Sequence, residues 1–217
     1  MTPRCWHTGH CGADGGWLDP LPPAPPATWL IHRRLASQVT GDLLPLLSPE
    51  EEVRFFRFRR QEDRERFLLG RGVLRMLLAP LLGVAPSAVR IVTSPHGKPC
   101  LDPACSDSPL QFNVAHSGDL ILLGFHPCRP VGVDLELQGE LEWQPIARRY
   151  FPRSVDDILA SLAQADQLPE FYRHWCRLEA ALKAQGTGFA ADSLVTEGAV
   201  IYDLLLPPHY SGSVAVL

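Results

Sequence analysis

The sequence lacks an apolar run long enough to span a bilayer, and its N-terminus lacks the pattern of a secretory signal. The formal net charge is only −4 over 217 residues, which gives no overall attraction to nucleic acid or to an anionic membrane. These absences favour a cytoplasmic protein that binds neither nucleic acid nor membrane. In that compartment, the six cysteines are expected to be reduced thiols.

Two motifs of common enzyme classes are also missing. The chain has no Gly-x-Ser-x-Gly nucleophile elbow and no Walker loop, so serine hydrolase and nucleoside triphosphatase functions have no support. Aromatic residues are sparse at 8%, but the apolar share of 46% is ordinary for a globular protein. A chain of this length can bury a core as one domain or as two small ones.

Residues 1–27 are rich in glycine and proline, and they contain four residues of types that commonly bind zinc: Cys5, His7, His10 and Cys11. No second ligand pair follows at the spacing of a zinc finger or ribbon. The alternatives are therefore a zinc site and a mobile tail, and the tail is favoured.

Helix signals follow in the next segment. Ser48, Pro49 and Glu51 form a helix start with a capping box, and an amphipathic pattern over residues 61–79 predicts a second helix that ends at Pro80. Eight of the 20 basic residues are arginines between positions 54 and 75. This local excess indicates either an anionic partner or a solvated helix face.

A hairpin is predicted over residues 112–125, and the polar segment 126–130 then reads as a joint between two parts of the chain. Residues 131–137 alternate as in a strand, so Asp134 and Glu136 share one face, about 6–7 Å apart along the backbone. Converging carboxylates suit a hard divalent cation such as Mg²⁺. By itself, however, such a pair is more often a solvated strand face.

Residues 169–185 read as a helix with an apolar stripe of Trp175, Leu178 and Leu182. Glu179 and Lys183 lie four residues apart along the edge of that stripe. Alone, this is an ordinary amphipathic helix with a surface ion pair. Next to Asp134 and Glu136, the pair would complete a site that handles phosphate.

Taken in order, five segments resemble the 4′-phosphopantetheinyl transferases of the surfactin-synthetase-activating type. They are residues 48–51 with Arg54, Gly97-Lys98-Pro99, residues 112–118, residues 131–136 and residues 175–188. The combination of Gly-x-Asp-x-Glu with a later Trp-x-x-x-Glu-Ala-x-x-Lys is specific at this separation. Residues 1–27 have no counterpart in the family pattern.

The resemblance implies an α+β fold of two pseudo-duplicated halves, residues 28–127 and 128–217, with coenzyme A bound in the cleft between them. It implies a monomer that transfers the 4′-phosphopantetheine arm of coenzyme A to a serine of an acyl or peptidyl carrier protein and releases adenosine 3′,5′-bisphosphate. Such an enzyme is a holo-[acyl-carrier-protein] synthase. The sequence does not indicate whether the carrier serves fatty acid, polyketide or nonribosomal peptide synthesis.

The resemblance also implies roles for individual residues. The metal ligands, for Mg²⁺ or alternatively Mn²⁺, are Asp134, Glu136 and Glu179. The residues at the 3′-phosphate end of coenzyme A are Arg54, Lys98 with Pro99, and His116. Glu179 is expected to take the proton of the carrier serine, and Lys183 to face the pyrophosphate and assist the departing phosphate.

Two positions depart from the commonest family pattern, and two rival functions stay open. Leu178 replaces a frequent lysine, and Ala115 replaces a frequent serine, which would remove a hydroxyl from the coenzyme site. The rivals are a non-catalytic relative that binds coenzyme A and a Mg²⁺-dependent phosphohydrolase. In the favoured function, arginines of the 54–75 segment complement an acidic helix of the carrier.

Overall fold

The computed structural model describes residues 4–5, 26–186 and 198–217. Its first sheet has the strand order β1-β2-β6-β5, formed by Arg4–Cys5, Ala27–His32, Leu120–His126 and Gln111–Ser117. Strands β5 and β6 form the predicted hairpin, and Gly118 turns it with a φ of 53°. The zinc site considered for the N-terminal tail lies outside the described part of the structure: this holds for His7, His10, Cys11 and the side chain of Cys5.

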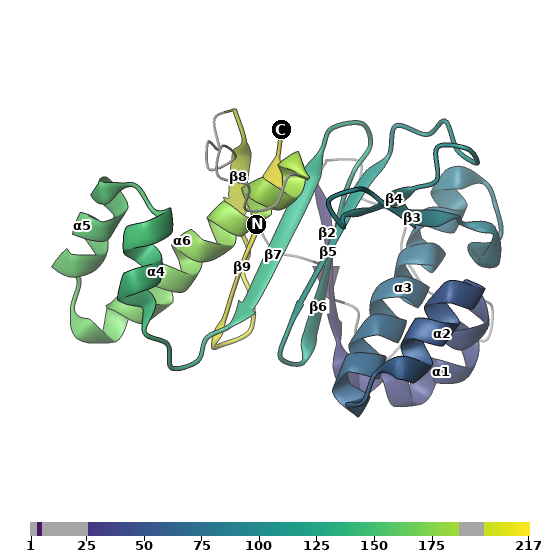
Figure 1. The fold of residues 1–217 in the computed structure, drawn as a ribbon, viewed down its shortest axis with the longest axis horizontal. Helices are drawn as coiled ribbons and strands as arrows, with labels where there is room; N and C mark the ends of the chain where they lie inside the picture. The colour runs from purple at the N-terminus through teal and green to yellow at the C-terminus, as the bar shows by residue number, and fades with distance from the viewer. Residues whose placement is uncertain (1–3, 6–25, 187–197) are drawn as a thin grey trace.

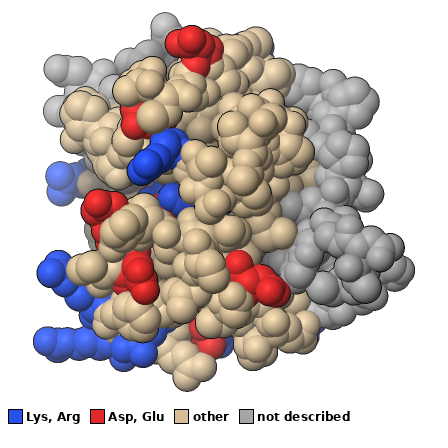
Figure 2. Space-filling model, turned by 90° about the vertical axis from the view of Figure 1, so that its right-hand side faces the viewer, with Lys and Arg blue, Asp and Glu red and all other residues tan. Residues whose placement is uncertain are grey.

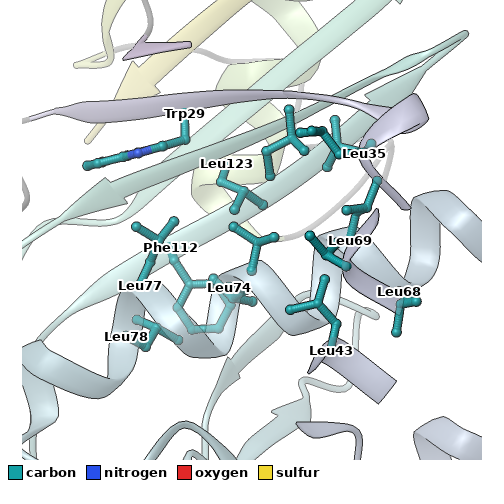
Figure 3. Packing of buried hydrophobic residues seen from close by; sticks show 14 of the residues in the cluster. Trp29, Leu35, Leu43, Leu68, Leu69, Leu74, Leu77, Leu78, Phe112 and Leu123 are labelled. Atoms are coloured by element: carbon teal, nitrogen blue, oxygen red, sulfur yellow. The ribbon is translucent and has the colours of Figure 1, made fainter. Parts of the chain in front are cut away.

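One face of this sheet is covered by α1 (Ala36–Leu43), α2 (Pro49–Arg57) and α3 (Gln61–Leu82), as Figure 1 shows. Short 3-10 turns occur at Arg33–Leu35, Leu44–Leu46 and Pro86–Ala88. Leucines of α3 pack against Trp29, Phe112 and Leu123 of the sheet (Figure 3). A separate hairpin of β3 (Ile91–Thr93) and β4 (Pro99–Leu101) lies beside this layer.

The second sheet has the order β7-β9-β8, with Val131–Leu137 pairing antiparallel to Tyr210–Val216 and the latter to Val200–Asp203. Three helices accompany it: α4 (Trp143–Tyr150), α5 (Arg153–Ser161) and α6 (Gln164–Gln185). The predicted α+β class is confirmed, whereas the division into residues 28–127 and 128–217 stays a prediction. No helix among the described residues is both long and apolar enough to cross a membrane.

Helix α6 approaches the second sheet closely because both surfaces carry small residues. Ala180 and Ala184 of α6 are buried against Gly132 of β7, where an added Cβ would lie 2.0 Å from the Ala180 carbonyl oxygen. The buried row of this part of the helix is thus Cys176, Ala180 and Ala184. The predicted stripe is only partly correct, since Leu182 is buried but Trp175 and Leu178 are half-buried.

The two sheets meet where β5 runs beside β7, and side chains supply hydrogen bonds across this seam. The Asn113 side-chain oxygen accepts from the Val133 N–H at 2.9 Å, and the Ser117 hydroxyl accepts from the Leu137 N–H at 3.0 Å. Lys98 donates from its ammonium to the Val131 carbonyl at 3.0 Å. The seam therefore fixes β7 relative to the first sheet without a backbone ladder.

Prolines misled the predicted helix ends. Helix α3 continues through Pro80, because a missing N–H in the last turn removes only one backbone hydrogen bond. The helix ends at Leu82, and Gly83 caps it in a left-handed conformation. Helix α6 begins at Gln164 rather than at Pro169, which lies inside its second turn. Helix α5 begins at Arg153 directly after Pro152, which occupies its N-cap.

Candidate active site

The acidic part of the site forms where β7 packs against α6. Strand alternation places Asp134 and Glu136 on one face of β7, and α6 brings Glu179 and Lys183 toward them. The Lys183 ammonium lies 2.5 Å from Asp134 Oδ1 and 3.2 Å from Glu179 Oε2. Asp134 is 1% exposed, and its buried Oδ2 has no hydrogen-bond partner in the part of the chain that the structure describes.

Burial and mutual repulsion shape the titration of these groups. Burial, followed by the charge of Asp134, raises the pKa of Glu136 to about 6, against a hydrogen bond from the Ser117 hydroxyl at 2.9 Å. The same two causes raise the pKa of Glu179, although Lys183 opposes them. Burial disfavours the Lys183 ammonium, but Asp134 and Glu179 raise its pKa above the ordinary value. The Lys183 ammonium thus contacts two of the three carboxyl groups, those of Asp134 and Glu179, and acts on Glu136 as a nearby charge.

This cluster fits a divalent cation in its chemistry. The unpartnered Asp134 Oδ2 and the excess of carboxyl groups would both be satisfied by one. As the side chains lie, however, no group of three or more His, Cys, Asp or Glu residues among those described is arranged to hold a metal, and Lys183 contacts two of the three predicted ligands. The metal assignment stays a prediction.

A pocket of about 300 Å³ adjoins the acidic cluster. It is lined by Glu179 and Lys183 from α6, by residues 96–99 of the β3–β4 turn, and by Asn113 and Val114 of β5. Lys98 is held here by two backbone carbonyls, those of Val131 and Ala184. Burial lowers the pKa of Lys98 to about 8.

A second pocket, of about 420 Å³, continues from the first, because Gly97, Pro99 and Val114 line both. Its further lining includes three arginines, Arg54, Arg66 and Arg71, together with His116 and with Asp63, which pairs with Arg66. The Arg54 guanidinium lies over the Phe67 ring at 5.2 Å. Burial and then Arg66 lower the pKa of His116, so its imidazole is neutral at pH 7. We call the two adjoining pockets together the bipolar groove. Its basic end is the pocket of Arg54, and its acidic end is the pocket beside the acidic cluster, which Glu179 lines together with Lys98 and Lys183.

The arginines of the 54–75 segment separate into groups. Buried Arg75 and half-buried Arg71 both contact Glu51 between α2 and α3, although the sequence did not specify which arginines would pair with local carboxylates. The available signal was their spacing of four residues on one helix. In contrast, Arg57, Arg59 and Arg60 are exposed and line neither pocket of the groove. Figure 2, which views the side of the molecule that carries α1–α3, shows basic side chains gathered toward its left edge with acidic ones among them.

The structure places the predicted residues as follows. Asp134, Glu179 and Lys183 are in direct contact, and Arg54 and His116 share the basic pocket. Pro99 lines both pockets, whereas Lys98 lines the acidic pocket and not that of Arg54.

The two departures from the family pattern lie away from the bipolar groove. Ala115 is buried in the seam with Leu135 and lines neither pocket, so a serine there would face the seam rather than the groove. Leu178 is half-buried on α6 and also lines neither.

Comparison with known proteins gives consistent matches over both parts of the chain. Residues 37–127 match the family model of the 4′-phosphopantetheinyl transferase N-terminal region, and residues 130–200 match that of the 4′-phosphopantetheinyl transferase superfamily. The chain is 39% identical to the 4′-phosphopantetheinyl transferase HetI of Nostoc sp. over 75% of its own length and 69% of the relative's. It is 29% identical to the 4′-phosphopantetheinyl transferase Sfp of Bacillus subtilis, covering 74% and 69% of the two chains. A rat L-aminoadipate-semialdehyde dehydrogenase-phosphopantetheinyl transferase is 30% identical, with 80% and 54% covered.

Proposed function

The chain belongs to the 4′-phosphopantetheinyl transferase family, and we propose that it transfers the phosphopantetheine arm of coenzyme A to a serine of an acyl or peptidyl carrier protein. The observation that carries this proposal is the bipolar groove. Its basic end suits the 3′-phosphate of coenzyme A, and its acidic end suits a cation bound to the pyrophosphate. One extended ligand with phosphates at two places complements both ends.

In the proposed reaction, Glu179 takes the proton of the carrier serine hydroxyl. The serine oxygen then bonds to the phosphorus of the phosphopantetheine, and the bond from that phosphorus to the bridging oxygen of the pyrophosphate breaks. Lys183 stabilises the departing phosphate of adenosine 3′,5′-bisphosphate or gives it a proton. The raised pKa of Glu179 makes its carboxylate a stronger base, and the raised pKa of Lys183 keeps its ammonium charged beside the departing phosphate.

Asp134, Glu136 and Glu179 would hold the divalent cation, with Mg²⁺ proposed and Mn²⁺ as an alternative. When bound, the cation would neutralise charge on the pyrophosphate. Lys183 contacts Asp134 and Glu179, so its ammonium would have to shift or share these oxygens with the cation. Ser117 fixes the orientation of the Glu136 carboxyl group through its hydrogen bond.

The carrier is proposed to dock against exposed arginines of the 54–75 segment, among them Arg57, Arg59 and Arg60. Acidic side chains of a carrier helix would complement them and speed association. Modification of the carrier should therefore slow as ionic strength rises. We also propose that the protein acts as a monomer, since one chain supplies both ends of the groove.

The proposed function is tested by incubating the protein with coenzyme A, Mg²⁺ and an apo carrier protein and measuring the intact mass of the carrier. Gain of the phosphopantetheine arm on a serine is the expected result. Breakdown of coenzyme A without gain on the carrier would indicate a phosphohydrolase. Binding of coenzyme A with neither change would indicate a non-catalytic relative.

A further inference from the structure

A buried charge cluster between α2 and α3 has no part in the transfer steps above. Glu51, in the first turn of α2, lies 2.7 Å from Arg75 and 3.5 Å from Arg71, both on α3. The Arg75 side chain is 2% exposed, and those of Arg71 and Glu51 are 15% and 14% exposed. We call these three residues the Arg–Glu–Arg cluster. It buries two guanidinium groups with one carboxylate.

The hydrogen-bond donors of this cluster exceed its acceptors. Arg71 Nη1, Arg75 Nε and Arg75 Nη1 are buried and have no hydrogen-bond partner within residues 4–5, 26–186 and 198–217. Glu51 cannot serve them all, because its carboxylate also accepts the Ser48 N–H of the α2 cap at 3.0 Å. A buried donor without a partner is costly, and a charged one is more costly still. These three nitrogens are too buried to contact an anion in the pocket, but the excess positive charge of the cluster would stabilise an anion placed beside it.

One member of the cluster reaches the bipolar groove. Arg71 lines the basic pocket together with Arg54 and His116, while Arg75 lies behind it and does not line that pocket. The Arg71 guanidinium is fixed on one side by Glu51 and on another by the Phe67 ring, 5.9 Å away. A guanidinium fixed in this way loses little conformational freedom when it binds a phosphate.

We propose that Arg71, oriented by Glu51 and backed by the charge of Arg75, binds the 3′-phosphate and makes the groove selective for coenzyme A over its 3′-dephospho form. This proposal rests on the proposed function, because it takes coenzyme A as the ligand. It divides the arginine segment into Arg71, which contacts the coenzyme, and the exposed Arg57, which does not. Arg75 acts as a positioning residue that never touches the phosphate.

The test combines a change in the protein with a change in the ligand. Calorimetry measures the dissociation constants of coenzyme A and of 3′-dephospho-coenzyme A for the wild type and for Arg71→Met. We expect Arg71→Met to weaken coenzyme A at least about 10-fold and the dephospho form less than about 2-fold, because a charge-assisted bond to the phosphate is lost. Equal weakening of both ligands, or no weakening of either, would overturn the proposal.

Arg57→Met is the matched control, because Arg57 is exposed and lines neither pocket of the groove; it should bind both ligands as the wild type does. Arg71→Lys guards against misfolding of the methionine variant, since it keeps the charge but loses the forked geometry. Its preference for coenzyme A should fall between those of the wild type and Arg71→Met, and an unchanged preference would contradict a direct bond to the phosphate. The carrier mass assay separates this proposal from the proposed function. If the wild type transfers the arm but binds coenzyme A and its dephospho form equally, the role of Arg71 is refuted and the transferase function is not.

Discussion

The molecule buries two ionic clusters of opposite sign, one at each end of the bipolar groove. In the Arg–Glu–Arg cluster, two guanidinium groups share the Glu51 carboxylate, and three donor atoms have no hydrogen-bond partner. At the acidic end, the Lys183 ammonium contacts Asp134 and Glu179, and Asp134 Oδ2 has no hydrogen-bond partner among the described residues. Positive charge is therefore in excess in the first cluster, and carboxyl groups are in excess in the second.

The difference between the clusters shows how a fold can prepare two ends of one ligand site. Burying an unneutralised charge is costly, so neither cluster contributes much to stability by itself. An anion at the basic end and a cation at the acidic end would each remove such a cost. The basic cluster joins two helices of the N-terminal layer, whereas the acidic cluster joins a strand to a closely packed helix. A substitution in the basic cluster should therefore mainly lower the stability of the protein, whereas one in the acidic cluster should mainly lower its activity.

The largest effect is expected from Glu179→Gln at the acidic end. The variant keeps the shape of the side chain but cannot take the proton of the carrier serine, so transfer should fall by about 10²–10⁴-fold. Coenzyme A should still bind, because the basic pocket is unchanged. Turnover is measured by carrier mass and binding by calorimetry. Turnover like that of the wild type would refute the role of Glu179 as the base.

The matching change at the basic end is Glu51→Gln. Glutamine can still close the capping box of α2, so the variant removes mainly the charge that neutralises Arg71 and Arg75. Stranding these guanidinium groups should lower the free energy of unfolding by about 3–5 kcal/mol, as measured by urea denaturation. Glu52→Gln, an exposed neighbour on the same helix, should change it by less than about 0.5 kcal/mol. Equal effects of the two variants would show that the cluster is not a stabilising contact.

Lys98 lies at the acidic pocket of the groove and provides a test by pH. Its pKa of about 8 lies below the ordinary value, so the folded protein binds fewer protons here than the unfolded chain between about pH 8 and 10.5. Its ammonium therefore destabilises the fold below pH 8, and this penalty is relieved as pH rises through that window. Relative to Lys98→Met, the wild type should gain stability from pH 8 to pH 10, measured by urea denaturation at each pH.

The same titration should affect ligand binding with the opposite sign. Coenzyme A phosphates favour the ammonium form of Lys98, so binding should weaken several-fold between pH 7 and pH 9. Lys98→Arg stays charged throughout this range and should show a flatter profile in calorimetry. A profile for Lys98→Arg as steep as that of the wild type would assign the pH dependence to another group.

Sequence patterns correctly predicted the features that depend on residues close together in the chain. The capping box of Ser48 and Glu51 and the alternation over residues 131–137 are present as predicted, because each depends on neighbouring backbone geometry. The contact of Asp134 with Lys183 could be inferred only from a family resemblance, since it joins residues 49 positions apart. Periodicity alone did not show that α6 buries an alanine row.

What escaped prediction depends on long-range packing. Glu51 was identified as a cap, but its second role toward Arg71 and Arg75 requires α2 to fold back on α3. Ala115 was assigned to the coenzyme site because the family pattern often has a serine there, next to His116. Adjacent side chains of a strand point to opposite faces, and the pairing of β5 with β7 decided which face became the seam.

The seam provides the smallest expected effect, from Ala115→Ser. Asn113 and Ser117 accept the N–H groups of Val133 and Leu137, each 20 positions later, so Ala115 lies opposite Leu135. Every second N–H group of a strand points to the same side, so the Leu135 N–H also faces β5. A serine hydroxyl at position 115 would accept a hydrogen bond from it.

This added bond should raise the free energy of unfolding by about 0.5–1.5 kcal/mol without changing turnover, because Ala115 lines neither pocket of the groove. Ala115→Cys is the control, being similar in size but a poor acceptor. A serine variant less stable than the cysteine variant in urea would show that the seam has no free donor at Leu135. An effect on turnover at unchanged stability would instead return residue 115 to the coenzyme site.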